Sequence, residues 1–198
     1  PAELYYNFGP LLAKQIIKNG KMDALNTALF GYVKNGLNTL PTSEQIYEPD
    51  KFFIDERYEE FSVESIDVDG YTLIDEGSIG ALDLVYLMQD KIGQKNAVNA
   101  AIGIGGGYWK DYVDASENLL MTLKLTGDDQ VELQEIHDAF ILWADTQPRF
   151  NNKETLVGGS LYLGDTNFWI SLDKSFIRIV LSQDIDLLNT ISNKLNDL

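Results

Sequence analysis

The residues best suited to chemistry in this chain are one histidine and a large set of carboxylates. His137 is the only histidine, and there is no cysteine, which excludes disulfides, thiolate metal sites and a cysteine nucleophile. His137 lies between Leu133 and Ile141 on an apolar helical face, which is typical of a core or boundary residue rather than a base or ligand. Neither an HExxH motif nor a GxSxG elbow is present. We therefore expect no catalytic residue, no metal ligand and no cofactor, and the chain alone is more consistent with a non-enzyme.

A run of glycines, Gly103, Gly105, Gly106 and Gly107, is the second feature that could serve chemistry. Its spacing does not fit the phosphate-binding motif GxGxxG, because Tyr108 stands where the last glycine is required, and no GK[ST] follows. The run instead predicts a tight turn from a helix into a strand, with positive φ at one or more glycines. Tyr108 and Trp109 follow at once and could line a groove. The predicted ligand-binding residues are Gly105, Gly106, Gly107, Tyr108 and Trp109.

The carboxylates allow two further interpretations. The segment Asp67-Val68-Asp69-Gly70 resembles the start of a calcium loop, but it lacks the third acidic position and the distal glutamate. It therefore predicts a turn before a strand at residues 71–74. Paired carboxylates could also carry out hydrolysis. The sequence does not select one pair among 31 acidic residues, so a carboxylate-dependent hydrolase remains a third hypothesis.

Composition limits the partners. The formal charge is −16, from 31 acidic and 15 basic residues, so the surface should repel nucleic acids and anionic membranes. Cationic partners, divalent ions or a high-salt habitat fit such a charge better. No apolar run approaches the roughly 20 residues that span a bilayer, so we expect no membrane insertion by this chain. Hydrophobic residues make up 44% of the chain, which predicts a packed globular protein.

The elements that would position these residues fall into two groups. Residues 1–40 show helical patterns, Thr42 or Ser43 should cap a short helical turn, and residues 49–70 are expected to form an extended connector. A buried helix ending at Gly93 should follow, and then a short alanine-rich helix that leads into the glycine turn. The first helix is apolar nearly all round, with Ala81, Leu84, Val85, Met88 and Ile92 on one side and Ile79, Leu82 and Tyr86 on the opposite flank, and the second carries the small residues Ala97, Ala100 and Ala101, which permit close helix packing.

After the glycines the pattern changes to strands. Residues 119–126 alternate as a strand, residues 133–144 form a helix, and residues 148–159 are expected to be a loop. Strands at 160–163, 167–172 and 175–181 and a helix at 185–195 complete the chain. The fold class predicted is α+β, with a helical N-terminal half packed on an antiparallel sheet and two C-terminal-half helices. We expect a single domain, 1–198, with candidate subdomains 1–105 (helical) and 106–198 (α+β sheet).

Two stretches resemble a known family. Residues 41–52, PTSEQIYEPDKF, and residues 100–108, AAIGIGGGY, are similar to conserved blocks of haloarchaeal and bacterial surface proteins and lipoproteins related to gluzincin-type zinc metallopeptidases. The order of the blocks matches over about residues 1–125. This chain departs from the family pattern at Glu48, Ala81, Ile104 and Gly107, where the family has His, Glu, Trp and Asp. The family's HExxH helix precedes these blocks, so no catalytic or metal residue carries over.

The resemblance implies the leading functional hypothesis. The chain would be a non-catalytic C-terminal scaffold or binding region of a surface-exposed, metallopeptidase-like protein, located extracellularly or at the cell surface. It would be a piece of a longer precursor whose upstream, catalytic-like segment is one expected partner. The alternative is an acidic extracellular ligand-binding module with no peptidase link, with its site near the glycines and Trp109.

Overall fold

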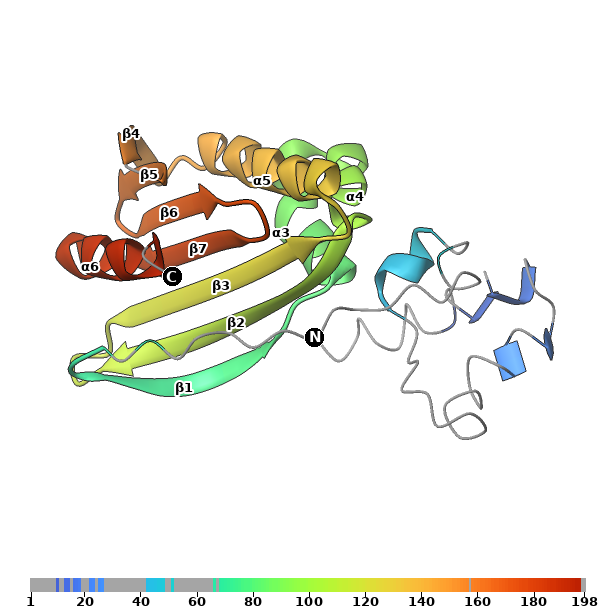
Figure 1. The fold of residues 1–198 in the computed structure, drawn as a ribbon, viewed down its shortest axis with the longest axis horizontal. Helices are drawn as coiled ribbons and strands as arrows, with labels where there is room; N and C mark the ends of the chain where they lie inside the picture. The colour runs from blue at the N-terminus through green and yellow to red at the C-terminus, as the bar shows by residue number, and fades with distance from the viewer. Residues whose placement is uncertain are drawn as a thin grey trace.

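The computed structural model describes residues 68–156 and 158–196, together with 42–48, 51, 66 and scattered positions among residues 10–26. Four α-helices, one 3₁₀ helix (η1) and seven strands occur in these described residues (Figure 1). Their order along the chain is η1 (Glu44–Ile46), β1 (Tyr71–Ser78), α3 (Ala81–Ile92), α4 (Gln94–Ala101), β2 (Ile104–Asp114), β3 (Leu119–Gly127), α5 (Gln130–Asp145), β4 (Phe150–Leu156), β5 (Gly159–Gly164), β6 (Asn167–Leu172), β7 (Ile177–Ser182) and α6 (Ile185–Asn196).

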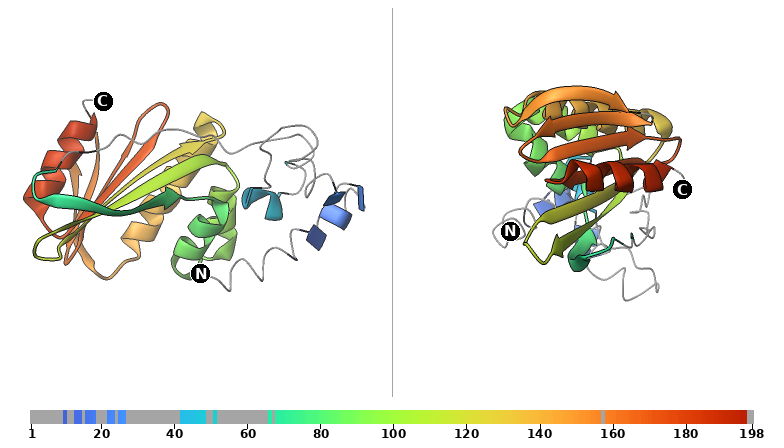
Figure 2. Two further views of the ribbon diagram at one scale, coloured as in Figure 1. Left: turned by 90° about the horizontal axis from the view of Figure 1, so that it is seen from below. Right: turned by 90° about the vertical axis from the view of Figure 1, so that its left-hand side faces the viewer.

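The strands form one antiparallel sheet in the order β1-β2-β3-β7-β6-β5-β4. Strands β1 and β4 are therefore its two edges. Figures 1 and 2 show β1, β2 and β3 as a long group of strands that extends away from α3 and α4. The C-terminal strands are shorter, six or seven residues each, and consecutive strands from β4 to β7 pair with each other.

One face of the sheet, called the helix face below, packs against α3, α4 and α5. Successive side chains of a strand point to opposite faces, so Leu123 and Leu125 of β3 share this face with Ile177 and Ile179 of β7. Their side chains are buried together with the apolar sides of the three helices. Trp143 of α5 packs edge-on against three aromatic rings, those of Phe140, Phe150 and Phe168.

The other face of the sheet, called the opposite face, packs against α6. Leu188, Ile191 and Leu195 of that helix are buried with apolar residues of the sheet. Three basic residues, Lys110, Lys124 and Arg178, are also buried on this face, each less than 9% exposed. Arg178 pairs with Asp173, and the Lys124 Nζ lies 4.0 Å from the centre of the Phe176 ring.

The expectation of a helical N-terminal half is wrong, although the α+β composition holds. Strand β1 lies in that half, and the seven-stranded sheet dominates the described structure. Most of the predicted helical region at 1–40 lies outside the described residues, as does most of the predicted connector, and the described positions among residues 10–26 are helical, as expected. The two expected helices are present as α3 and α4, and Gly93 ends α3 with φ 83°, but α3 is buried on one side only, since Tyr86 on its opposite flank is 68% exposed.

Only the first glycine of the run, Gly103, lies in a turn, and the other three lie in strand β2, which is the second correction. The turn lies at Ile102 and Gly103, and residues 104–114 are strand β2. Positive φ among the described glycines occurs at residues 70, 93 and 158. The glycines of β2 serve close packing instead. A Cβ added at Gly107 would lie 2.3 Å from Ile79 Cγ2 and 2.5 Å from Leu125 Cδ2. A side chain at Gly107 would therefore clash with side chains of neighbouring segments of the same chain.

The loop expected at 148–159 is the third correction, because β4 occupies residues 150–156. Its polar sequence, FNNKETL, belongs to an edge strand that pairs with one neighbour only. The other C-terminal predictions are confirmed. Strands β3, β5, β6 and β7 and helices α5 and α6 agree with the expected bounds to within a few residues.

Candidate functional site: the edge strand β1

The predicted ligand-binding residues all lie in β2. Gly105, Gly106 and Gly107 are buried, and Tyr108 and Trp109 are half-buried. Tyr108 lies opposite Ser78 and Trp109 opposite Gly77 in the neighbouring strand. The prediction that these five residues bind a ligand stays a prediction. Strand β1, which pairs with β2 beside Tyr108 and Trp109, is an exposed edge of the sheet and is therefore the candidate binding surface.

Strand β1 is unusually accessible for a strand of eight residues. Six of its side chains are exposed and two are half-buried. Leu73 is 42% exposed and Ile74 is 55% exposed, although both are large apolar residues. Ile74 lies at a bulge, because the register with β2 shifts between Leu73 and Asp75. An exposed edge strand carrying apolar side chains is able to pair with another extended chain.

The outer side of β1 offers main-chain groups as well. Ile79 N donates to Gly107 O at 3.0 Å. Because antiparallel pairs alternate between bonded and non-bonded, the main-chain groups of Ser78 and Glu76 point away from β2. The Glu76 amide donates to Asp75 Oδ1 at 2.9 Å. The side chain of Asp75 therefore covers one of the two outward-facing amides, and an incoming strand could take its place.

Two carboxylates face each other across β1 and β2. Asp75 and Asp111 are directly opposite in the register, so both side chains lie on the helix face. Asp75 is exposed and Asp111 is half-buried. Partial burial, with the charge of Asp75 added, raises the pKa of the Asp111 carboxyl. Like charges directly opposite each other destabilise a sheet. This pair is therefore a place where added positive charge would be favourable.

The same stretch of β1 carries a different charge arrangement on the opposite face. Glu76 lies opposite Lys110, with 3.7 Å between Lys110 Nζ and Glu76 Oε2. Partial burial and the neighbouring Glu76 carboxylate raise the pKa of the Tyr108 hydroxyl. Thus Glu76 already has cationic and hydroxyl neighbours on its face of the sheet. On the helix face, Asp75 and Asp111 have no basic side chain opposite or beside them in the register of the described strands.

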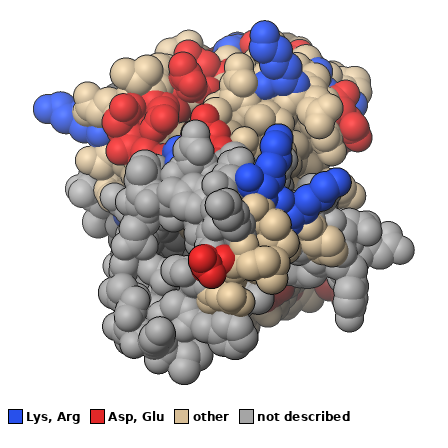
Figure 3. Space-filling view, turned by 90° about the vertical axis from the view of Figure 1, so that its right-hand side faces the viewer, with Lys and Arg blue, Asp and Glu red and all other residues tan. Residues whose placement is uncertain are grey.

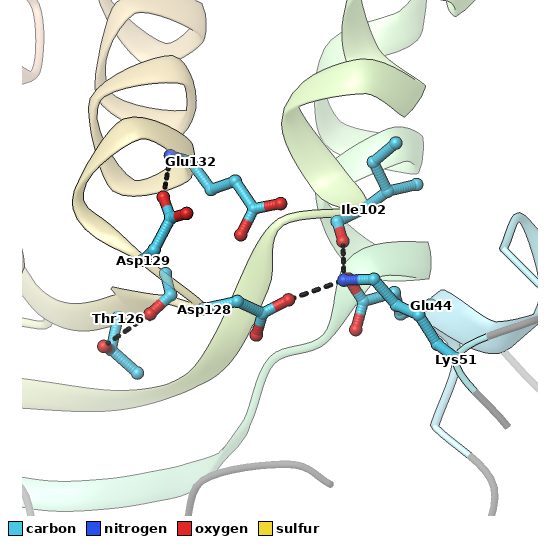
Figure 4. Close-up of polar contacts among 8 residues, drawn as sticks. Glu44, Lys51, Ile102, Thr126, Asp128, Asp129 and Glu132 are labelled. Carbon is cyan, nitrogen blue, oxygen red and sulfur yellow. Dashed lines mark hydrogen bonds and ion pairs between the residues drawn. The ribbon is translucent and has the colours of Figure 1, made fainter. Parts of the chain in front are cut away.

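A second group of carboxylates, at the other end of β2, has a lysine between them. Lys51 Nζ donates to Glu44 Oε1 at 2.6 Å, to Asp128 Oδ2 at 2.5 Å and to the carbonyl of Ile102 at 2.6 Å (Figure 4). An ammonium group has three donors, and each of these contacts takes one. We call Lys51, Glu44 and Asp128 the lysine clasp. It joins η1 to the turns that precede β2 and α5.

The lysine clasp is reinforced by nearby main-chain contacts. Asp128 N donates to Gly103 O at 2.9 Å, and Leu82 N near the start of α3 donates to Ser43 Oγ at 3.2 Å. Ser43 thus supports α3 instead of capping η1, the short helical turn that the sequence predicted. Figure 3 shows this end of the molecule, where basic and acidic side chains of the described residues both appear. The clasp and these contacts join η1 to the turns before β2 and α5 and to the start of α3.

The remaining sequence candidates lie apart from β1. His137 is half-buried on α5, with Nδ1 3.3 Å from Asp138 Oδ1. The expected turn before β1 is present, since Gly70 has φ 81° and Tyr71 N donates to Val68 O at 3.0 Å. Among the described residues, no group of three or more His, Cys, Asp or Glu side chains is arranged to hold a metal ion. No described helix is long and apolar enough to cross a membrane.

The candidate site was not visible in the sequence. Asp75 and Asp111 are 36 positions apart, and only the register of β1 against β2 brings them together. One available signal was the mixture in Tyr71–Ser78 of apolar residues, acids and a glycine, which is typical of an exposed edge strand.

Comparisons with known proteins add no relative. Neither a protein-family model, nor a curated protein, nor a solved structure matches this chain. The resemblance to metallopeptidase-related surface proteins therefore rests on the quoted residues alone. The function proposed below is therefore inferred from the chemistry of the described residues.

Proposed function

We propose that this chain is a non-catalytic binding domain that takes up an extended segment of a partner on the outer edge of β1. One observation carries the proposal: an edge strand of eight residues exposes Leu73 and Ile74 and directs main-chain groups of Glu76 and Ser78 outward. An added strand would gain main-chain hydrogen bonds from the edge and apolar contacts from the two side chains. This mode of recognition needs neither a deep pocket nor a metal.

The other sheet edge does not support the same role. Strand β4 presents mostly polar side chains, and its Lys153 Nζ lies 3.3 Å from Asp145 Oδ1 and 4.9 Å from the centre of the Tyr162 ring. Charged and polar residues of this kind protect an edge from pairing. Strand β4 therefore serves as an internal reference for any binding experiment on β1.

The sequence resemblance extends this proposal to a biological setting. Within a surface-exposed protein related to metallopeptidases, such a domain would be a scaffold or binding region beside a catalytic-like segment. The acidic composition supports an extracellular location. The alternative is an acidic extracellular ligand-binding module with no peptidase link, with its site near the glycines and Trp109 of β2, the strand next to β1. An HExxH segment encoded upstream of Pro1 in the same gene would favour the first setting, and its absence would favour the second.

A test should prevent pairing of a partner strand at the outer edge of β1 while it keeps the hydrogen bonds between β1 and β2. In Glu76→Pro the lost amide is one that points away from β2, so pairing with β2 should survive. Glu76→Ala removes the same carboxylate and keeps the amide, which makes it the matched control. Binding of synthetic extended peptides, of mixed charge and as long as β1, would be measured by fluorescence anisotropy. We expect Glu76→Pro to lose binding by about tenfold and Glu76→Ala to retain it.

The interpretation depends on whether the variants remain folded, which circular dichroism and thermal melting would establish. If Glu76→Pro loses structure, Ser78→Pro offers a second outward-facing position for the same measurement. Equal binding by the folded proline variants and the parent protein would refute the edge-strand function.

A further inference from the structure

We infer that the segment that β1 takes up is cationic, with a lysine or arginine that lies over Asp75 and Asp111. This inference rests on the proposed function and adds the chemistry of the partner. It starts from the register, which places the two carboxylates opposite each other on the helix face. Neighbouring strands lie about 4.8 Å apart, so a long basic side chain of an added strand can pass Asp75 and reach Asp111.

The surroundings of the two carboxylates favour a cation. Partial burial, together with the charge of Asp75, raises the pKa of Asp111, so a nearby positive charge would favour its ionised form. The neighbours of Asp111 on the helix face are Trp109 and Val113 in its own strand and Met121 in β3. None of these side chains carries a charge. A lysine or arginine from a partner would supply the missing one.

Pairing would also free Asp75 to act on the partner. In the unbound protein its Oδ1 accepts from the Glu76 amide. An added strand supplies a carbonyl for that amide, as in any antiparallel ladder. The Asp75 carboxylate is then released to accept from the basic side chain. Main-chain pairing and charge recognition are thereby coupled at one residue.

The same charges exclude a second copy of the chain as the occupant. Pairing of β1 with β1 of another molecule would bring Asp75 and Glu76 of each copy to one edge, and like charges across strands oppose association. The overall charge of −16 acts in the same direction. The edge is therefore protected against self-association while it remains open to a basic strand.

The experiment compares three synthetic peptides that differ only in charge. Each is as long as β1 and alternates valine with lysine, glutamine or glutamate. Fluorescence anisotropy would be measured with the full chain, with the double variant Asp75→Asn/Asp111→Asn, and with Glu154→Gln on β4 as a control for loss of a charge elsewhere. Melting curves would confirm that each variant is folded.

We expect the lysine peptide to bind the parent chain at least about tenfold more tightly than the glutamine peptide, and the double variant to lose that preference. Glu154→Gln should keep it. If all uncharged and charged peptides bind equally, and Glu76→Pro abolishes that binding, the proposed function stands and the inference fails. If the lysine peptide binds the double variant and Glu76→Pro as well as the parent, general charge attraction explains it, and both fail. If no peptide binds, both fail as well.

Discussion

Two groups of carboxylates among the described residues, one at the lysine clasp and one at β1, differ in whether a cation lies between them. At the lysine clasp, the ammonium of Lys51 contacts both Glu44 and Asp128. At β1, Asp75 and Asp111 face each other with no basic side chain among the described neighbours of Asp111 on that face. The first arrangement stabilises the fold. The second costs stability, and a partner that supplies the cation would recover it.

The largest effect is expected from breaking the clasp. Lys51→Met removes the cation and leaves Glu44, whose side chain is 6% exposed, beside Asp128. Removing one member of a buried ion pair leaves an uncompensated charge, so the free energy of unfolding should fall by about 3 kcal/mol. Urea denaturation would measure the loss.

Lys153→Met is the matched control for this change. Its ion pair with Asp145 joins two side chains that are each more than 40% exposed. Solvent screening should limit the loss to about 0.5 kcal/mol. Equal losses in the two variants would show that the clasp is no more than a surface contact.

A smaller effect is expected at Ser43, which joins η1 to α3. Ser43→Ala removes the acceptor of the Leu82 amide in the first turn of α3, and loss of such an acceptor costs about 1 kcal/mol. The exposed Ser175, changed to Ala, is the control. Thermal melting of both variants would decide whether the contact stabilises α3, and an unchanged melting temperature for Ser43→Ala would contradict it.

Removing one charge at β1 should increase the free energy of unfolding, whereas the changes above decrease it. Asp111→Asn ends the repulsion with Asp75, and the free energy of unfolding should rise by about 0.5 kcal/mol at pH 7. Asp165→Asn, at an exposed turn, is the control and should change little. A clear loss of stability in Asp111→Asn would mean that its carboxylate has a stabilising partner.

The pH dependence of that gain follows from the direction of the pKa shift. The pKa of Asp111 is higher in the folded protein than its ordinary value of 3.8, so ionisation costs stability above the folded pKa. That cost disappears as the pH falls below the unfolded value. The advantage of Asp111→Asn should therefore be present at neutral pH and absent in acid. Denaturation curves at several pH values would measure it.

The smallest expected effect is that of added salt on the melting temperature. Since the chain carries a net charge of −16, screening should reduce self-repulsion, and the melting temperature should rise with added NaCl. The Debye length falls from about 10 Å at 0.1 M to about 3 Å at 1 M. The rise should be slightly smaller in Asp75→Asn/Asp111→Asn than in the parent chain. A flat curve in the parent chain would indicate that its acids are already compensated.

Much of the fold could be predicted because packing leaves periodic patterns. The spacing of Ala81, Leu84, Val85, Met88 and Ile92 identified α3 because one helix face is buried. The alternation in β3 and the turns between the C-terminal strands were equally informative. These signals are local, and the residues that produce them are close in sequence.

The errors arose where one residue type serves two purposes. Glycine permits a turn, but in β2 it permits close approach, as the position of Ile79 over Gly107 shows. The polar residues of β4 suggested a loop, although an edge strand tolerates them equally well. The contact of Lys51 with Asp128, 77 positions away, and the pairing of Asp75 with Asp111 were beyond prediction because such distant residues leave no local pattern.

Amide hydrogen exchange of the full chain, with and without the lysine–valine peptide, tests the central claim most directly. Exchange would be followed at Glu76 and Ser78 in β1, with the amides of β4 as the internal reference. If β1 takes up a cationic strand, the peptide should slow exchange at Glu76 and Ser78 and leave β4 unchanged. Unchanged exchange at Glu76 and Ser78 under saturating peptide, or equal protection of β4, would contradict the account.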